Sequence, residues 1–288
     1  MSGGHRQALV EIHVAVLLFG FAGLFGKWLT LPAWCIVLGR TGFATLALLT
    51  VLPFSPPKRF PVDLKSVGRL GVLGVLLAVH WVAFFKAIQV ASVAVGLLAF
   101  ATFPVFITCL EPWWFAEKRR RIDILTAVMV VVGLGIMVYP SPFEGRIFVG
   151  TLWGTFAGFS FAVLCLLNRK WVKNYAPEMI ALFQNGFGAL ALVPWLLLAE
   201  VQVDAGQIGL LAILGVLCTA LAHTLFIRGL RFIRAQLASV IATLEPVYGI
   251  ALAFFLLHEI PSAYTLAGGT LILLTTLLAM GQRAAVNG

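Results

Sequence analysis

Three ionisable side chains interrupt long apolar stretches of this sequence: Arg40, His80 and Glu245. An ionisable group at the centre of a bilayer costs about 2.5–3.5 kcal/mol on insertion scales, so each is a candidate functional residue. Glu245 could bind an ammonium group or carry a coupling proton, or it could be a neutral acid hydrogen-bonded between helices. Arg40 could line the mouth of a cavity or reach outward to the headgroups. His80 could contact a solute or make an interhelical hydrogen bond.

Aromatic residues accompany these groups and could form a wall that selects apolar or aromatic side chains. Two of them follow His80 within about one helical turn, and three others flank the prolines at 104 and 246. Gln184 is a neutral polar group that could hydrogen-bond a carboxylate or hold two helices together. The expected substrate-binding residues are therefore Arg40, His80, Trp81, Phe84, Phe100, Phe103, Gln184, Glu245 and Tyr248.

Residues that bend helices lie close to these candidates. Pro104, Pro246, Gly20 and Gly249 are the expected hinges, because proline frees backbone carbonyls and glycine permits close approach and bending. Glu117 and Glu259 each follow one of the prolines by 13 residues. These two acids could close gates with basic residues near the loops, or they could cap helix ends in the headgroup zone.

No pattern for catalysis, cofactor or metal binding is present in the sequence. The four cysteines stand singly, the five histidines form no HExxH pattern, and there is no Walker A sequence that would bind ATP. We therefore expect no catalytic residue, metal or cofactor, and any transport must be driven by gradients. The net charge of +9 has no basic soluble surface to occupy, so it does not indicate nucleic-acid binding.

The elements that must position these residues are transmembrane helices. Hydrophobic residues make up 61% of the 288 residues and charged residues 11%, with a mean hydropathy of +1.03. Apolar segments of about 20 residues, the length that crosses a bilayer, fill almost the whole chain. The first begins near Ile12 without a small-residue cleavage site, which favours a retained helix over a signal peptide. We predict ten helices, at about 11–29, 33–52, 68–88, 92–112, 122–139, 149–168, 178–199, 207–228, 236–257 and 262–281.

The basic residues indicate how this all-α protein is oriented. With ten helices and a cytoplasmic N-terminus, sixteen of the 20 Lys and Arg residues fall on the cytoplasmic side. Only Lys27, Lys86 and Arg146 fall on the far side, and Arg40 lies within a helix. The positive-inside bias therefore predicts that both termini face the cytoplasm, as in a multi-pass protein of a bacterial inner membrane.

The two halves of the chain resemble each other. Lys86, Pro104 and Glu117 lie 142 residues before Arg228, Pro246 and Glu259. Such ordered matches indicate an internal duplication into residues 1–140 and 141–288. Because each half has five helices, the second enters the membrane from the opposite side. An inverted repeat of this kind places a solute site at the midplane between the halves.

These motifs resemble the drug/metabolite transporter superfamily, and within it the EamA-type transporters with ten helices. The resemblance covers essentially the whole chain and rests on the sequence from Leu244 to Val247, the two Pro-to-Glu spacings and the stretch from Phe19 to Lys27. It is greatest to the bacterial members that export amino acids, and it implies export of aromatic and other amino acids. One departure is Phe103, which stands where the second half has Glu245.

Together these features predict a secondary exporter of small amphiphilic solutes, amino acids first, that works by alternating access as a monomer in the lipid bilayer. Facilitated diffusion and proton antiport through Glu245 or His80 both remain open. A multidrug or other metabolite exporter of the same fold is the alternative. An intramembrane enzyme is more distant, because the acids are scattered singly, and a channel would need a continuous polar path.

Overall fold

The computed structural model describes residues 3–51, 63–115, 121–139, 145–171, 175, 177–229 and 241–287. Within these ranges the regular structure is entirely helical, as the sequence predicts. The helices are α1 (Gly3–Trp28), α2 (Ala33–Val51), α3 (Leu64–Val90), α4 (Val93–Phe100), α5 (Phe103–Phe115), α6 (Arg121–Val138), α7 (Arg146–Trp171), α8 (Pro177–Leu198), α9 (Ala205–Gly215), η2 (Val216–Leu221), α10 (Ala222–Gly229), α12 (Glu245–Leu257) and α13 (Ala263–Asn287).

Seven segments of the described chain are long and apolar enough to cross a membrane. They are Arg6–Trp28, Ala33–Val51, Leu64–Val90, Val93–Phe115, Arg146–Asn168, Glu178–Leu196 and Ala205–Phe226. Three shorter apolar helices accompany them, at Ile124–Val138, Glu245–Leu257 and Ala263–Leu278. Apolar side chains such as Phe255 and Leu278 are about two-thirds exposed, at 70% and 67%, which suits a surface that faces lipid.

Two predicted helices are not uniform. The segment expected at 92–112 breaks after Phe100, and α5 begins at Phe103. Pro104 explains the break, because a proline ring clashes with the carbonyl four residues earlier, here that of Phe100. The segment expected at 207–228 is continuous but passes through the π-helical stretch η2. The first five residues of the segment expected at 236–257 lie outside the described part of the chain.

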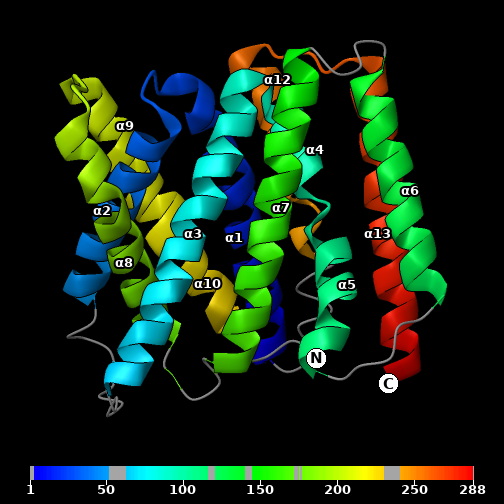
Figure 1. The fold of residues 1–288 in the computed structure, drawn as a ribbon, viewed down its shortest axis with the longest axis horizontal. Helices are drawn as coiled ribbons and strands as arrows, with labels where there is room; N and C mark the ends of the chain where they lie inside the picture. The colour runs from blue at the N-terminus through cyan, green and yellow to red at the C-terminus, as the bar shows by residue number, and fades with distance from the viewer. Residues whose placement is uncertain are drawn as a thin grey trace.

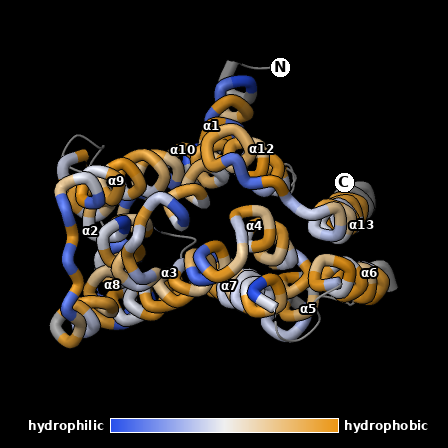
Figure 2. Tube along the Cα trace, turned by 90° about the horizontal axis from the view of Figure 1, so that it is seen from above, coloured by the Kyte–Doolittle hydropathy of each residue, from blue (hydrophilic) through white to orange (hydrophobic). Residues whose placement is uncertain are grey.

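The helices stand side by side with both termini at the same end of the bundle (Figure 1). Helix α3 packs against α7 and α8, and α1 packs against α10 and α12. Seen along the bundle, α6 and α13 form a pair at one edge, and hydrophobic residues predominate along the helices (Figure 2). The helices α1, α2, α3 and α10 thus surround the middle of the molecule, where the candidate residues lie.

Candidate functional site

Arg40 is almost completely buried, with 2% of its surface exposed. Its guanidinium carbon lies 3.7 Å from the centroid of the Trp81 ring and 5.5 Å from that of Phe85, both on α3. Its Nε donates a hydrogen bond of 3.1 Å to Oγ1 of Thr219. Arg40 therefore points into the bundle toward α3 and η2, so the alternative that it reaches outward to the headgroups is wrong.

The π-helical segment η2 places the acceptor for Arg40. Oγ1 of Thr219 donates to the carbonyl of Leu214, five residues earlier, at 2.9 Å, and so can receive the Arg40 Nε–H on its lone pairs. Gly215, just before η2, lets α2 approach closely: a Cβ there would lie 2.7 Å from the carbonyl oxygen of Arg40. Short π-helical turns occur frequently at functional sites.

His223 and Glu245 complete the surroundings of Arg40. The His223 ring lies 5.6 Å from that of Trp81 and 5.3 Å from that of Phe19, centroid to centroid. The charge of Arg40 acts on both His223 and Glu245. Glu245 is the first residue of α12, where the helix dipole favours a negative charge. The His223 and Glu245 side chains are both half-buried, whereas Arg40 is buried.

His80 lies in an aromatic cluster beside the Arg40 centre, formed by His80, Phe84, Phe100, Phe103 and Phe161. Its ring centroid is 4.9 Å from that of Phe161 and 5.2 Å from that of Phe100. Nδ1 of His80 lies 3.0 Å from the carbonyl oxygen of Ala157 and donates to it, because a carbonyl only accepts. His80 thus makes the interhelical hydrogen bond that the sequence offered as one alternative, while its ring still faces aromatic neighbours.

Other expected binding residues lie elsewhere. Nε2 of Gln184 donates to Oδ1 of Asn168 at 2.7 Å, which joins α8 to α7. Tyr248 packs with the α1 residue Phe19, and its hydroxyl lies 3.4 Å from Nδ1 of His13. Among the described residues, no group of three or more His, Cys, Asp or Glu side chains could hold a metal ion.

The expected hinge residues lie where helices cross or begin. A Cβ on Gly20 would be 2.8 Å from the backbone nitrogen of Gly249, so α1 and α12 cross with almost no side chain between them. Pro246 and Pro104 lie in the first turns of α12 and α5. The first turn is where proline fits a helix, because its missing N–H has no intrahelical partner there.

Of the two expected gate residues, the structure describes Glu259. Glu259 lies between α12 and α13, and its carboxylate oxygens accept from the backbone N–H of Val93 at 2.9 and 3.3 Å. It therefore caps the N-terminus of α4 from the other half of the chain. Glu117 lies outside the described residues.

Sequence reasoning missed Thr219, His223 and Phe161. His223 is an ionisable residue within the apolar segment formed by α9, η2 and α10, which is the signal that drew attention to His80. Thr219 carried no such signal, because a threonine in an apolar helix commonly bonds its own backbone.

Comparison with known proteins assigns the chain to a family. The model of the EamA-like transporter family matches residues 8–139 and again residues 148–281. The chain belongs to this family. It is thus a multi-pass membrane transporter, and a small molecule is its substrate.

Several relatives of this EamA-like transporter span nearly its whole length. A transporter of Archaeoglobus fulgidus is 29% identical over 95% of this chain and 96% of its own. The Bacillus subtilis transporter YxxF is 24% identical over 96% and 90%. A protein named biotin transporter in Escherichia coli is 25% identical over 94% and 91%. One crystal structure matches 98% of this chain with a TM-score of 0.65 at 17% identity, which shows the fold alone. None of these names mentions amino acids.

Proposed function

We propose that this chain is a secondary transporter that binds a small carboxylate-bearing solute, amino acids first, at the Arg40 centre. The observation that carries this proposal is the state of Arg40. It is 2% exposed, and no carboxylate of the described residues lies within ion-pair distance of it. Glu245 is close enough for its charge to act on Arg40 but forms no ion pair with it, and a buried cation without a directly paired carboxylate costs several kcal/mol. A carboxylate on the solute supplies that partner, and the planar guanidinium binds it with two parallel hydrogen bonds.

The surroundings of Arg40 suit the rest of an amino acid. Glu245 is half-buried at the start of α12, and its side-chain oxygens can accept hydrogen bonds from the solute ammonium. The rings of Trp81 and His223, and the aromatic cluster behind them, can pack against an apolar or aromatic side chain. The solute is thus held by charge at both ends of its backbone and by apolar contact along its side chain.

Biotin is a second candidate solute, and the names of relatives favour it. The Escherichia coli and Pseudomonas aeruginosa relatives, 25% and 27% identical, are named biotin transporter and probable biotin transporter. Biotin also carries a carboxylate on an apolar body, but it has no ammonium group. Arg40 suits either solute, whereas Glu245 has a binding role only for an amino acid.

The proposed topology is ten helices in two inverted repeats, residues 1–140 and 141–288. The two separate family matches support this division, as do the seven longer and three shorter apolar helices. Both termini lie at one end of the bundle, which supports a location on the same side of the membrane for both, and the bias of the basic residues makes that side the cytoplasm (Figure 1). The protein would then lie in the inner membrane and work as a monomer. The crossing of α1 and α12 at Gly20 and Gly249 is a natural pivot for alternating access.

The energy source is a gradient, used by facilitated diffusion or by proton antiport through Glu245 or His80. Proteoliposomes with an imposed pH gradient separate the two. Antiport makes export faster when the gradient drives protons inward against the solute, and slower when the gradient is reversed. Equal rates with gradients of either sign would contradict antiport.

Transport in proteoliposomes tests the proposed substrate. Efflux of radiolabelled threonine, methionine, phenylalanine, tryptophan and biotin is compared for the wild type, Glu245→Gln and His80→Ala. Saturable amino-acid efflux that Glu245→Gln weakens supports an amino-acid exporter. Biotin flux that is insensitive to Glu245→Gln assigns the second candidate. No flux of any of these solutes would contradict the proposal and favour a multidrug exporter.

A further inference from the structure

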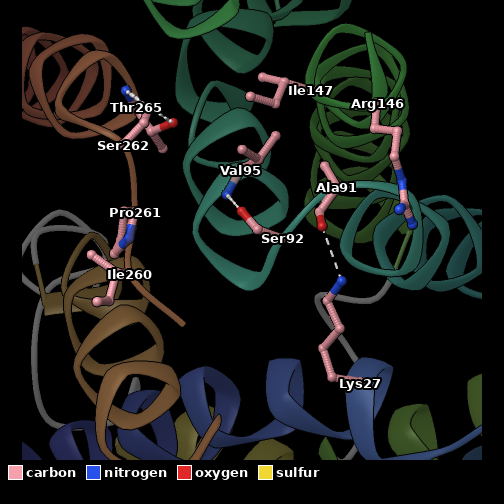
Figure 3. A pocket seen from close by; sticks show the side chains of 10 residues that line it. All are labelled: Lys27, Ala91, Ser92, Val95, Arg146, Ile147, Ile260, Pro261, Ser262 and Thr265. Carbon is pink, nitrogen blue, oxygen red and sulfur yellow. Dashed lines mark hydrogen bonds between the residues drawn. The ribbon is translucent and has the colours of Figure 1, made fainter. Parts of the chain in front are cut away.

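A cavity of about 360 Å³ is lined by the end of α1, the α3–α4 junction, the start of α7 and the connection from α12 to α13 (Figure 3). The start of α7 and the connection from α12 to α13 lie at the end of the bundle opposite the termini (Figure 1). None of the residues of the Arg40 centre lines this cavity. Its polar lining consists of two cations and three hydroxyl groups, from Lys27, Arg146, Ser92, Ser262 and Thr265. The transport cycle proposed above assigns no role to this cavity.

Both cations have hydrogen-bond donors to spare. Nζ of Lys27 donates to the carbonyl of Ala91 at 2.9 Å, and Nε of Arg146 donates to the carbonyl of Val90 at 2.9 Å. Within the described part of the chain these are the hydrogen bonds of the two side chains. An ammonium group has three donors and a guanidinium group has five. Several N–H groups therefore remain for a ligand.

The cavity carries an excess of positive charge. Lys27 is acted on by the negative charge of Glu259 and by the positive charge of Arg146. The Glu259 carboxylate already accepts the backbone N–H of Val93. The N-terminal ends of α4 and α13, which carry the positive ends of their helix dipoles, also face this region. An oxyanion would balance this field.

The rim of the cavity is apolar and aromatic. Ile147, Ile260 and Pro261 line it, and Ile260 is 79% exposed. Tyr264 lies next to Thr265 in the chain and packs edge-on against Tyr139, with ring centroids 5.3 Å apart. Tyrosines of this kind mark the boundary between hydrocarbon and headgroups. The cations therefore lie at headgroup depth, beside acyl chains.

We infer that this cavity binds the phosphate of an anionic phospholipid, between Lys27 and Arg146. The volume favours a whole headgroup over inorganic phosphate, because a water molecule occupies about 30 Å³ of liquid and the cavity is an order of magnitude larger. Oγ of Ser92 accepts from the backbone N–H of Val95 at 3.0 Å and keeps its own proton to donate to a phosphate oxygen. Arginine and lysine bind phosphate oxygens through charge-assisted hydrogen bonds, which for arginine are frequently bidentate. This inference does not depend on the identity of the transported solute.

Binding of short-chain lipids to the purified protein in neutral detergent tests the inference. Dihexanoylphosphatidylglycerol is titrated against the wild type, Arg146→Gln and Lys86→Gln, with native mass spectrometry and the unfolding temperature as readouts. Lys86 is the matched control. It is an exposed cation near the end of α3, and it does not line the cavity. We expect Arg146→Gln to weaken binding by about tenfold, the scale for losing one charge-assisted hydrogen bond, and Lys86→Gln to leave it unchanged.

Two further ligands separate the possible sources of the oxyanion. Dihexanoylphosphatidylcholine, which has no net charge, should bind more weakly than the anionic dihexanoylphosphatidylglycerol. Inorganic phosphate should neither raise the unfolding temperature nor compete at equal concentration. If phosphate competes as well as the lipid, the site takes a soluble anion and the lipid assignment is overturned. If all three proteins bind the lipid equally, the cavity is no anion site.

Discussion

The guanidinium of Arg40 stacks on the ring of Trp81 at 3.7 Å, and this contact joins α2 to α3 in the interior of the bundle. A cation over an aromatic face contributes about 0.5–1 kcal/mol at exposed sites and about 2 kcal/mol or more when it is desolvated. With Thr219 on Nε, the contact fixes the plane of the guanidinium. Its Nη edge is then oriented before a solute arrives, which reduces the entropic cost of binding.

Arg40→Lys tests whether this plane matters. Lysine keeps the charge but lacks the planar fork that grips a carboxylate. We expect the KM for the transported solute to rise at least about tenfold, equivalent to about 1.4 kcal/mol. Arg69→Lys is the matched control, because Arg69 also lies over a tryptophan, Trp171, at 5.9 Å but far along α3 toward its start. An equal effect of both substitutions on KM would contradict a binding role for Arg40.

Thr219→Val should impair transport by removing the acceptor of Arg40 while keeping the side-chain shape. An unsatisfied buried donor costs about 1–3 kcal/mol, so we expect a fall in transport affinity and a lower unfolding temperature. Thr219→Ser keeps the hydroxyl and should restore the affinity. The measurement is KM in proteoliposomes together with the unfolding temperature in detergent. Failure of serine to restore affinity would show that the methyl group matters more than the hydrogen bond.

Gly20→Ala should disturb the crossing of α1 and α12. The added Cβ would lie 2.8 Å from the backbone nitrogen of Gly249 and 2.9 Å from the carbonyl oxygen of Glu245, and backbone atoms cannot move aside cheaply. Overpacking of this kind costs about 1–3 kcal/mol. Gly135→Ala is the control, because nothing lies within 4 Å of a Cβ there. Alanine at 135 should be neutral or stabilising, since it favours helix by about 1 kcal/mol over glycine. Equal unfolding temperatures for the two variants would contradict the close crossing.

Glu259 should make stability depend on pH. Burial raises the pKa of the Glu259 carboxyl above its ordinary value, although the hydrogen bond from Val93 and the charge of Lys27 oppose this shift. The folded protein therefore binds more protons than the unfolded chain once the pH exceeds the unfolded pKa. The contribution of this group to stability is present at low pH and is lost as the pH rises through the folded pKa.

Thermal unfolding across this range, with Glu259→Gln as the comparison, measures the contribution. Glutamine can still accept the backbone N–H of Val93 through its side-chain oxygen, but it does not titrate. We expect the wild type to lose stability relative to Glu259→Gln as the pH rises above the ordinary glutamate value. A difference that is constant with pH would contradict the raised pKa.

The sequence identified much of the fold and part of the site. Hydrophobicity over about 20 residues predicts helices well, and Pro104 even explains where one of them breaks. Arg40, His80 and Glu245 could be found because charge in an apolar segment is costly. Thr219 could not, since nothing in the sequence predicts the π-helical turn η2 or the hydrogen bond between Thr219 and Arg40. Gln184 makes the interhelical hydrogen bond that the sequence offered as one alternative, but its partner Asn168 could not be identified, because nothing in the sequence pairs the two residues.

Competition by carboxamide analogues tests the central claim most directly. In proteoliposomes that transport labelled phenylalanine or biotin, unlabelled solute is compared with its carboxamide, which has the same shape but no negative charge. Our account predicts that the carboxylate competes at least about tenfold better than the carboxamide, and that Arg40→Ala abolishes this preference. Equal competition by the two forms in the wild-type protein would contradict Arg40 as the carboxylate site.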